Sequence, residues 1–81
     1  MPTVKPDKSI DIKGFVCPIT FVRSKLALEA MQAGEVLEIL TDYEGASVNI
    51  PRSMEEQGHE SLSVEKVSEK EWRLLIRKGG G

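Results

Sequence analysis

The stretch that decides the fold is SIDIKGFVCPIT, residues 9–20. Ile10 and Ile12 alternate with polar residues, which is the pattern of a half-buried strand. Gly14 ends this strand. Pro18 suits the first position of a helix, because its φ angle is already helical and its missing N–H is not needed there. The stretch therefore predicts a strand, a glycine-bearing loop and a helix start, with Cys17 where loop and helix meet.

The rest of the chain continues the alternation of strand and helix and ends on two successive strands. The predicted elements are a strand near residues 10–12, a helix from 18 to about 33, a strand at 36–40, a helix at about 45–57, a strand near 62–67 and a strand at 72–77. Gly34 and Gly58 stop the two helices, Pro51 interrupts the second one, and residues 69–71 form a turn.

This β-α-β-α-β-β order predicts an α/β (α+β) two-layer sandwich. Its four-stranded mixed sheet carries two helices on one face. Residues 9–79 are expected to form a single domain, with residues 1–8 as a flexible leader and residues 80–81 as a flexible tail.

Length and composition narrow the classes of function. A chain of 81 residues buries only about 60% of its unfolded surface, so a site is expected at the surface. The net charge of −2 argues against direct nucleic-acid binding. One cysteine and one histidine exclude an internal disulfide and a multi-cysteine zinc site, so no cofactor is expected. The sequence shows no signal peptide and no apolar run of membrane-spanning length, and a free thiol fits the cytoplasm.

The predicted first helix carries two apolar arcs. One arc contains Phe21, Ala27, Leu28 and Met31, with Thr20 and Ser24 among them. The other arc contains Ile19, Val22, Leu26, Ala30 and Ala33. A two-layer fold offers one sheet to pack against, so one arc stays partly exposed. Either the second arc is the core stripe, or the first arc is core and Ile19, Val22 and Leu26 form an apolar patch beside Cys17. Such a patch suits a relay between proteins.

Cys17 is the candidate reactive residue. As the residue before the helix, its sulfur is predicted to accept hydrogen bonds from the N–H groups of Ile19 and Thr20. A helix N-terminus is a setting that lowers a cysteine pKa from about 8.5 to roughly 3.5–7.5. Lys13 adds positive charge, and Lys25 faces a bound partner. The alternative is a buried, inert cysteine, because free cysteines are among the most buried residues.

The stretch DIKGFVCPIT, residues 11–20, resembles the signature of the TusA (SirA-like) sulfur-carrier family, Asp-x-Arg/Lys-Gly-x-x-Cys-Pro-x-Pro. The likeness covers nearly the whole domain from about residue 9. It implies a sulfur carrier or sulfurtransferase that accepts sulfane sulfur as a persulfide on Cys17. The donor would be a cysteine desulfurase or a rhodanese-like protein. The acceptor protein would serve tRNA thiolation, molybdenum-cofactor synthesis or sulfur oxidation.

The resemblance also implies roles for the neighbours of Cys17. Gly14 lets the loop turn tightly and Pro18 shapes the helix start. Lys25 and Asp42 match positions that family members present to partners, and Val22 and Leu26 join them as candidate partner contacts. The protein is expected to be a monomer when free and to bind no membrane. Whether such a carrier counts as an enzyme is a matter of definition.

One departure from the signature is Thr20, which replaces the second proline. Its N–H is hypothesised to be an extra donor that stabilises the thiolate or persulfide of Cys17. The departure leaves open which partners are used.

Other readings remain open beside the sulfur carrier. Cys17 could be structural in a non-catalytic interaction or regulatory module, or the chain could be an RNA-associated domain. The terminal Gly79-Gly80-Gly81 suggests a thiocarboxylate carrier, although such proteins open with a β-hairpin. Asp42 is more simply a turn or cap residue. His59 is more simply a solvent-facing loop or strand-start residue.

Overall fold

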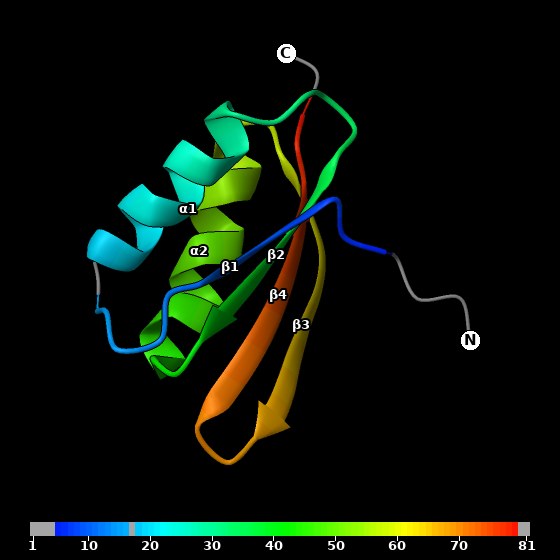
Figure 1. The fold of residues 1–81 in the computed structure, drawn as a ribbon. Coiled ribbons are helices and arrows are strands. Elements are labelled where there is room, and N and C mark those ends of the chain that lie inside the picture. Colours follow the sequence, from blue (N-terminus) through cyan, green and yellow to red (C-terminus); the bar gives the residue numbers. More distant parts are fainter. Residues whose placement is uncertain (1–4, 17, 80–81) are drawn as a thin grey trace.

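The structure, a computed structural model, is a two-layer α/β sandwich and describes residues 5–16 and 18–79. Figure 1 shows both helices on one side of a four-stranded sheet. The elements are β1 (Lys8–Asp11), α1 (Ile19–Glu29), β2 (Val36–Thr41), α2 (Glu44–Glu56), β3 (Glu60–Ser68) and β4 (Glu71–Arg77). The predicted fold class and element order are confirmed. Predictions that concern residues 1–4, 17 and 80–81 lie outside the described residues.

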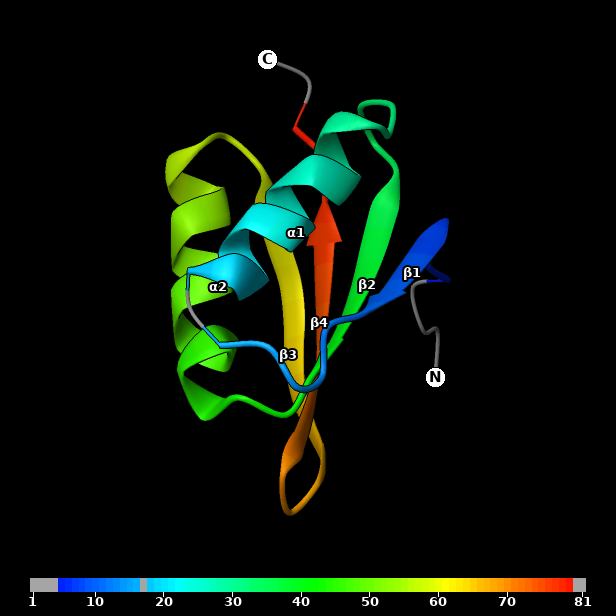
Figure 2. The ribbon, with the colours of Figure 1, turned by 60° about the vertical axis from the view of Figure 1, so that its left-hand side comes forward.

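The sheet has the strand order β1-β2-β4-β3. β1 runs parallel to β2, with Ile10 opposite Ile39, whereas β4 runs antiparallel to both of its neighbours. The parallel pair needs a crossover, which α1 supplies, and β3 and β4 form a hairpin. β2 is therefore an inner strand of the sheet, next to β1, the strand that leads towards Cys17 (Figure 2).

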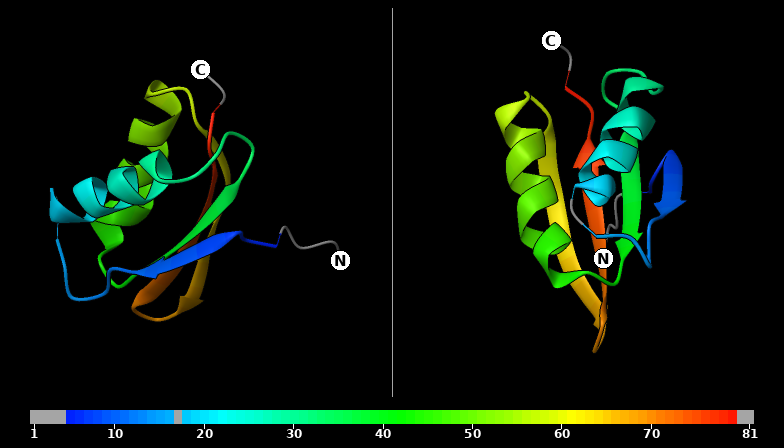
Figure 3. Two further views of the ribbon diagram at one scale, coloured as in Figure 1. Left: turned by 45° about the horizontal axis from the view of Figure 1, so that its top comes forward. Right: turned by 90° about the vertical axis from the view of Figure 1, so that its left-hand side faces the viewer.

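Figure 3 shows the layer of two helices beside the sheet. The core consists of buried side chains from both layers. Its largest fully buried side chains from the sheet and α2 are Leu37, Ile39, Ile50, Met54, Leu74 and Ile76. The opposite face of the sheet carries charge. Arg73 of β4 lies between Glu38, at 3.5 Å, and Glu65, at 2.9 Å. Neither α1 nor α2 is long and apolar enough to cross a membrane.

Several element boundaries differ from the predictions, among them the end of α1 and the start of β1. α1 ends at Glu29, four residues before the predicted end, and a turn leads to Gly34, whose φ of +90° suits glycine. β1 begins at Lys8, and Asp7 is already tied to the sheet. Its N–H donates to the Val36 carbonyl at 2.8 Å, and its carboxylate accepts from the Val36 N–H at 2.8 Å.

The prediction that Pro51 interrupts the second helix is wrong. α2 runs unbroken from Glu44 to Glu56 with Pro51 inside it. Proline costs a helix interior about 3 kcal/mol, because it removes one hydrogen bond and crowds the preceding turn. Ala46, Ile50 and Met54 recur every four residues and are all fully buried, and their burial against the sheet outweighs that cost.

Candidate functional site

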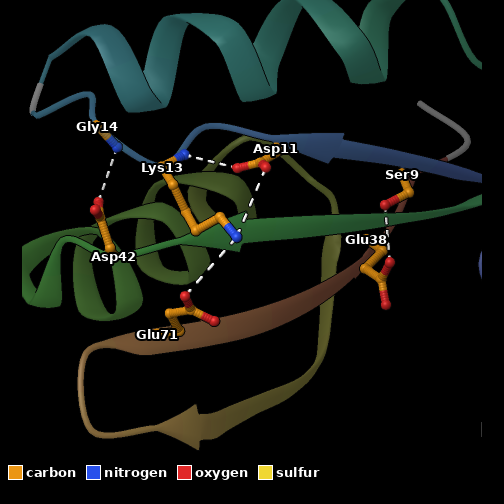
Figure 4. A network of polar contacts seen from close by, with 7 residues as sticks. All are labelled: Ser9, Asp11, Lys13, Gly14, Glu38, Asp42 and Glu71. Atoms are coloured by element: carbon orange, nitrogen blue, oxygen red, sulfur yellow. Dashed lines mark hydrogen bonds and ion pairs between the residues drawn. The ribbon is translucent and has the colours of Figure 1, made fainter.

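The loop between β1 and α1 is held to the sheet by hydrogen bonds. The Ile12 N–H donates to the Leu40 carbonyl of β2 at 2.8 Å, and the Phe15 N–H donates back to the Ile12 carbonyl at 3.2 Å. Gly14 lies at the turn with a φ of +91°, a conformation that glycine adopts without strain. Its N–H donates to Oδ1 of Asp42 at 2.9 Å (Figure 4). The backbone therefore has a defined path up to Val16, directly before Cys17.

The first turn of α1 closes on Val16. Both the Ile19 N–H and the Thr20 N–H donate to the Val16 carbonyl, at 2.9 and 3.2 Å, and Pro18 precedes the first helical residue. The prediction that these two N–H groups bind the Cys17 sulfur concerns a side chain outside the described residues. Pro18 is the N-cap residue of α1 and not, as predicted, its first helical residue. Cys17 itself lies outside the described residues.

Phe15 anchors the same loop from its other side. Its ring is half-buried and packs against the core, and the Arg23 guanidinium lies 4.2 Å from the ring centre. A cation over an aromatic face is attracted by the negative charge of the ring surface. Sequence reasoning missed Arg23, because the two residues are eight positions apart and only one of them lies in a helix.

The two arcs of α1 have opposite exposures. Thr20, Ser24 and Leu28 are at most 1% exposed, whereas Ile19, Val22 and Leu26 are 47%, 48% and 59% exposed. This confirms the prediction in which the first arc is core. Val16, at 55% exposed, extends the exposed arc into the loop. We call these four residues, Val16, Ile19, Val22 and Leu26, the α1 apolar surface.

A shallow hollow borders the α1 apolar surface. It has a volume of about 370 Å³ and is lined by Ile10, Asp11, Ile12, Arg23 and Leu26. It lies between β1 and α1, and Leu26 belongs both to the hollow and to the apolar surface. One guanidinium and one carboxylate lie among apolar walls there.

The two predicted lysines lie in different settings. Lys13 is turned towards carboxylates, with its Nζ 3.8 Å from Asp11 and 3.8 Å from Glu71 (Figure 4). Its charge is therefore shared with two acidic groups. Lys25 is exposed on α1, one residue before Leu26 of the apolar surface. Within residues 5–16 and 18–79, no three histidine, aspartate or glutamate side chains gather as a metal site.

Asp42 and His59 each accept a hydrogen bond from a distant backbone N–H. Asp42 follows β2 and binds Gly14, and it does not cap α2, whose N-cap residue is Tyr43. His59 directly precedes β3, as the strand-start prediction has it. It is half-buried, and its Nδ1 accepts from the Gly79 N–H at 2.9 Å.

Comparison with known proteins shows the family of the chain. The family model described as sulfurtransferase TusA matches residues 8–78. The chain belongs to the TusA family. Among TusA relatives, an Archaeoglobus fulgidus protein is 52% identical over 93% of this chain and 85% of its own length. A Thermotoga maritima protein is 40% identical over 86% of this chain and 89% of its own. The names of both describe them, by inference, as sulfur carrier proteins.

Solved structures agree with the TusA assignment. The crystal structure of a SirA-like protein from Desulfitobacterium hafniense is 30% identical and superposes with a TM-score of 0.79. The solution structure of a Helicobacter pylori protein is 27% identical with a TM-score of 0.71. Each comparison covers 89% of this chain and 97% of the other. The match to the family model, over residues 8–78, includes the whole segment from β1 through α1.

Proposed function

We propose that this TusA-family protein carries sulfane sulfur as a persulfide on Cys17 and passes it from a donor protein to an acceptor protein. The observation that supports this most directly is the α1 apolar surface. Val16 and Ile19 flank position 17 in the sequence, and both are about half exposed. Monomeric proteins cover apolar side chains of this kind when a partner binds. A sulfur carrier needs such a surface, because the partner must bring a second sulfur into contact with the sulfur of the carrier.

The proposed transfer is a thiolate exchange. The Cys17 thiolate attacks the outer sulfur of a donor persulfide. A new S–S bond forms on Cys17, the S–S bond of the donor breaks, and the donor cysteine leaves as a thiolate. In the second step, a nucleophilic thiolate of the acceptor attacks the outer sulfur on Cys17 and releases the Cys17 thiolate. One sulfur moves in each step, so no outside oxidant or reductant is consumed.

The partners are proteins on both sides of the exchange. A cysteine desulfurase or a rhodanese-like protein would donate the sulfur, and the acceptor would serve tRNA thiolation, molybdenum-cofactor synthesis or sulfur oxidation. Val22, Lys25 and Leu26 are the proposed partner contacts on α1. Exposed apolar side chains beside a cation favour a partner whose binding face is apolar with acidic residues at its edge. We place the exchange in the cytoplasm, with the carrier monomeric when free.

Sulfur loading tests the proposal. The protein is incubated with a persulfide-charged cysteine desulfurase or rhodanese-like donor, and its intact mass is measured. The expected result is the gain of one sulfur in the wild type and no gain in Cys17→Ala. Loading that survives Cys17→Ala would contradict the assignment of Cys17. Failure of the wild type to load from several donors would favour the non-catalytic interaction module.

A further inference from the structure

We infer that Asp42 is a positioning residue for the cysteine loop; the inference rests on the proposed function of Cys17. The resemblance to family members points to Asp42 as a partner contact. In the structure, its carboxylate instead binds a backbone N–H of this same chain. Oδ1 of Asp42 accepts a hydrogen bond from the N–H of Gly14, 28 residues earlier in the chain, at 2.9 Å. Gly14 lies in the loop that leads to Cys17, so this bond joins the loop to the residue that directly follows β2.

The bond continues the pairing of β1 with β2 beyond the last strand residue. Asp11 is the last residue of β1 and lies opposite Leu40. The Ile12 N–H still donates to the Leu40 carbonyl. Two residues further along each segment, the Gly14 N–H meets the Asp42 side chain instead of a backbone carbonyl. The carboxylate therefore extends the ladder at the point where the loop turns away from the sheet.

No other contact of Asp42 competes with this one in the described part of the chain. No lysine or arginine nitrogen of residues 5–16 and 18–79 lies within 4 Å of its carboxylate oxygens. α2 begins directly after it, but the α2 N-cap residue is Tyr43 and makes no side-chain cap bond. Asp42 is exposed, so the bond to Gly14 accounts for its placement better than core packing does.

Further contacts hold the loop between Gly14 and the residue before Cys17. Phe15 is fixed by its N–H bond to Ile12 and by the Arg23 guanidinium over its ring. The carbonyl of Val16 takes the first two N–H groups of α1. Gly14, Phe15 and Val16 are thus each held by a hydrogen bond, and Val16 is the residue before Cys17. Release of the Gly14 N–H frees the loop to rotate, since glycine opposes rotation less than any other residue.

Two substitutions separate positioning from partner contact. Asp42→Asn keeps the Oδ1 acceptor and removes the charge, whereas Asp42→Ala removes both. Glu44→Gln is the matched control, because it removes one negative charge two residues away. Three quantities are measured in each variant: amide hydrogen exchange at Gly14 by NMR, the alkylation rate of Cys17 with iodoacetamide, and the rate of sulfur transfer from a persulfide-charged donor.

A positioning role predicts a graded result. Asp42→Ala should speed exchange at Gly14 and slow sulfur transfer, each by about tenfold, which is the loss expected for one charge-assisted hydrogen bond. Its alkylation rate should also differ from that of the wild type. Asp42→Asn should recover all three quantities to within about threefold, because a neutral acceptor keeps the geometry with a weaker bond. Glu44→Gln should match the wild type.

Two results overturn the inference. One is rapid exchange at Gly14 in the wild type itself, which needs no variant to fold. The other is an Asp42→Asn variant as slow in transfer as Asp42→Ala while Gly14 exchange and alkylation stay unchanged, since that pattern assigns Asp42 to partner contact through its charge. Failure of the proposed function looks different. The wild type would not load sulfur, whereas Gly14 would still be protected in the wild type and exposed in Asp42→Ala.

Discussion

At the scale of single residues, Thr20 has contacts that its replacement of a signature proline does not predict. Its N–H donates to the Val16 carbonyl at 3.2 Å, whereas the hypothesis that it stabilises Cys17 concerns a residue outside the described part of the chain. The side chain of Thr20 is almost fully buried, and Oγ1 has no hydrogen-bond partner among the described residues. A buried hydroxyl without a partner loses the hydrogen bonds that it makes to water when the chain is unfolded.

Thr20→Val should therefore stabilise the protein. Valine has nearly the shape of threonine and a similar helix propensity, so the substitution removes the hydroxyl and little else. We expect the free energy of unfolding to rise by about 1 kcal/mol, measured by urea denaturation. Thr20→Ser is the control, because it keeps the hydroxyl and loses a buried methyl group, and it should lower the free energy. A destabilised Thr20→Val would show that Oγ1 is satisfied in solution.

At the scale of elements, α1 shows what its sequence determines and what it leaves open. Its two arcs are both apolar enough to pack against a sheet, and periodicity does not say which of them does. The buried arc contains Thr20 and Ser24, two small polar residues. Ser24 satisfies its own hydroxyl by donating to the Thr20 carbonyl at 2.8 Å, which allows the helix to pack closely there. Ile19, Val22 and Leu26 of the other arc remain at the surface.

The exposed arc makes a prediction about transfer between proteins. Val22→Ser should lower the efficiency of sulfur transfer from a protein donor by about fivefold, because it removes an apolar contact at the proposed interface. Unfolding free energy should change by no more than about 0.5 kcal/mol, since Val22 is half exposed.

Val48→Ser on α2 is the matched control for Val22. Val48 is 57% exposed and the chemical change is the same, but it lies on the other helix. It should leave the transfer rate unchanged, as measured by intact mass over time. Equal effects of the two substitutions would mean that the α1 apolar surface has no special part in partner binding.

Element type was predictable from the sequence, whereas helix boundaries and end contacts were not. The alternation of Ile10 and Ile12 is a local signal, and the structure has β1 there. Gly34 and Gly58 both have a positive φ, as expected of glycines that follow helices, but α1 already ends at Glu29. The prediction for Pro51 was wrong because the free-energy cost of a proline in a helix is a local effect, whereas the burial of the neighbouring residues depends on the whole fold. The bonds from the Ile19 and Thr20 N–H groups to the Val16 carbonyl were not predictable for a different reason. Residue type does not reveal which backbone acceptor the first N–H groups of a helix reach.

At the scale of the whole molecule, hydrogen bonds join segments that lie far apart in the sequence. The end of β4 meets the turn after α1, where Gly34 donates to the Lys78 carbonyl at 2.9 Å and Lys78 donates to the Glu35 carbonyl at 2.8 Å. Nearby, the Gly79 N–H reaches His59. These pairs lie up to 44 residues apart, and no periodic pattern in the sequence predicts them.

Lys78 adds a side-chain bond to this junction. Its ammonium donates to the Glu29 carbonyl at 3.4 Å and to the Met31 carbonyl, at the C-terminal end of α1. The last carbonyl groups of a helix lack partners within the helix and carry partial negative charge. α1 has no basic residue of its own in its last turn, so a residue from beyond β4 supplies the cation.

Lys78→Met should therefore lower the free energy of unfolding by about 1–2 kcal/mol, as measured by urea denaturation at low salt. Methionine fills a similar volume, so the loss reports the ammonium and its hydrogen bonds. Lys70→Met removes the same charge from the exposed turn between β3 and β4 and should change stability by no more than about 0.5 kcal/mol. Equal losses in the two variants would mean that net charge, and not the capping of α1, accounts for the effect. A selective loss at Lys78 would show that the helix which begins beside Cys17 is stabilised from the last strand of the sheet.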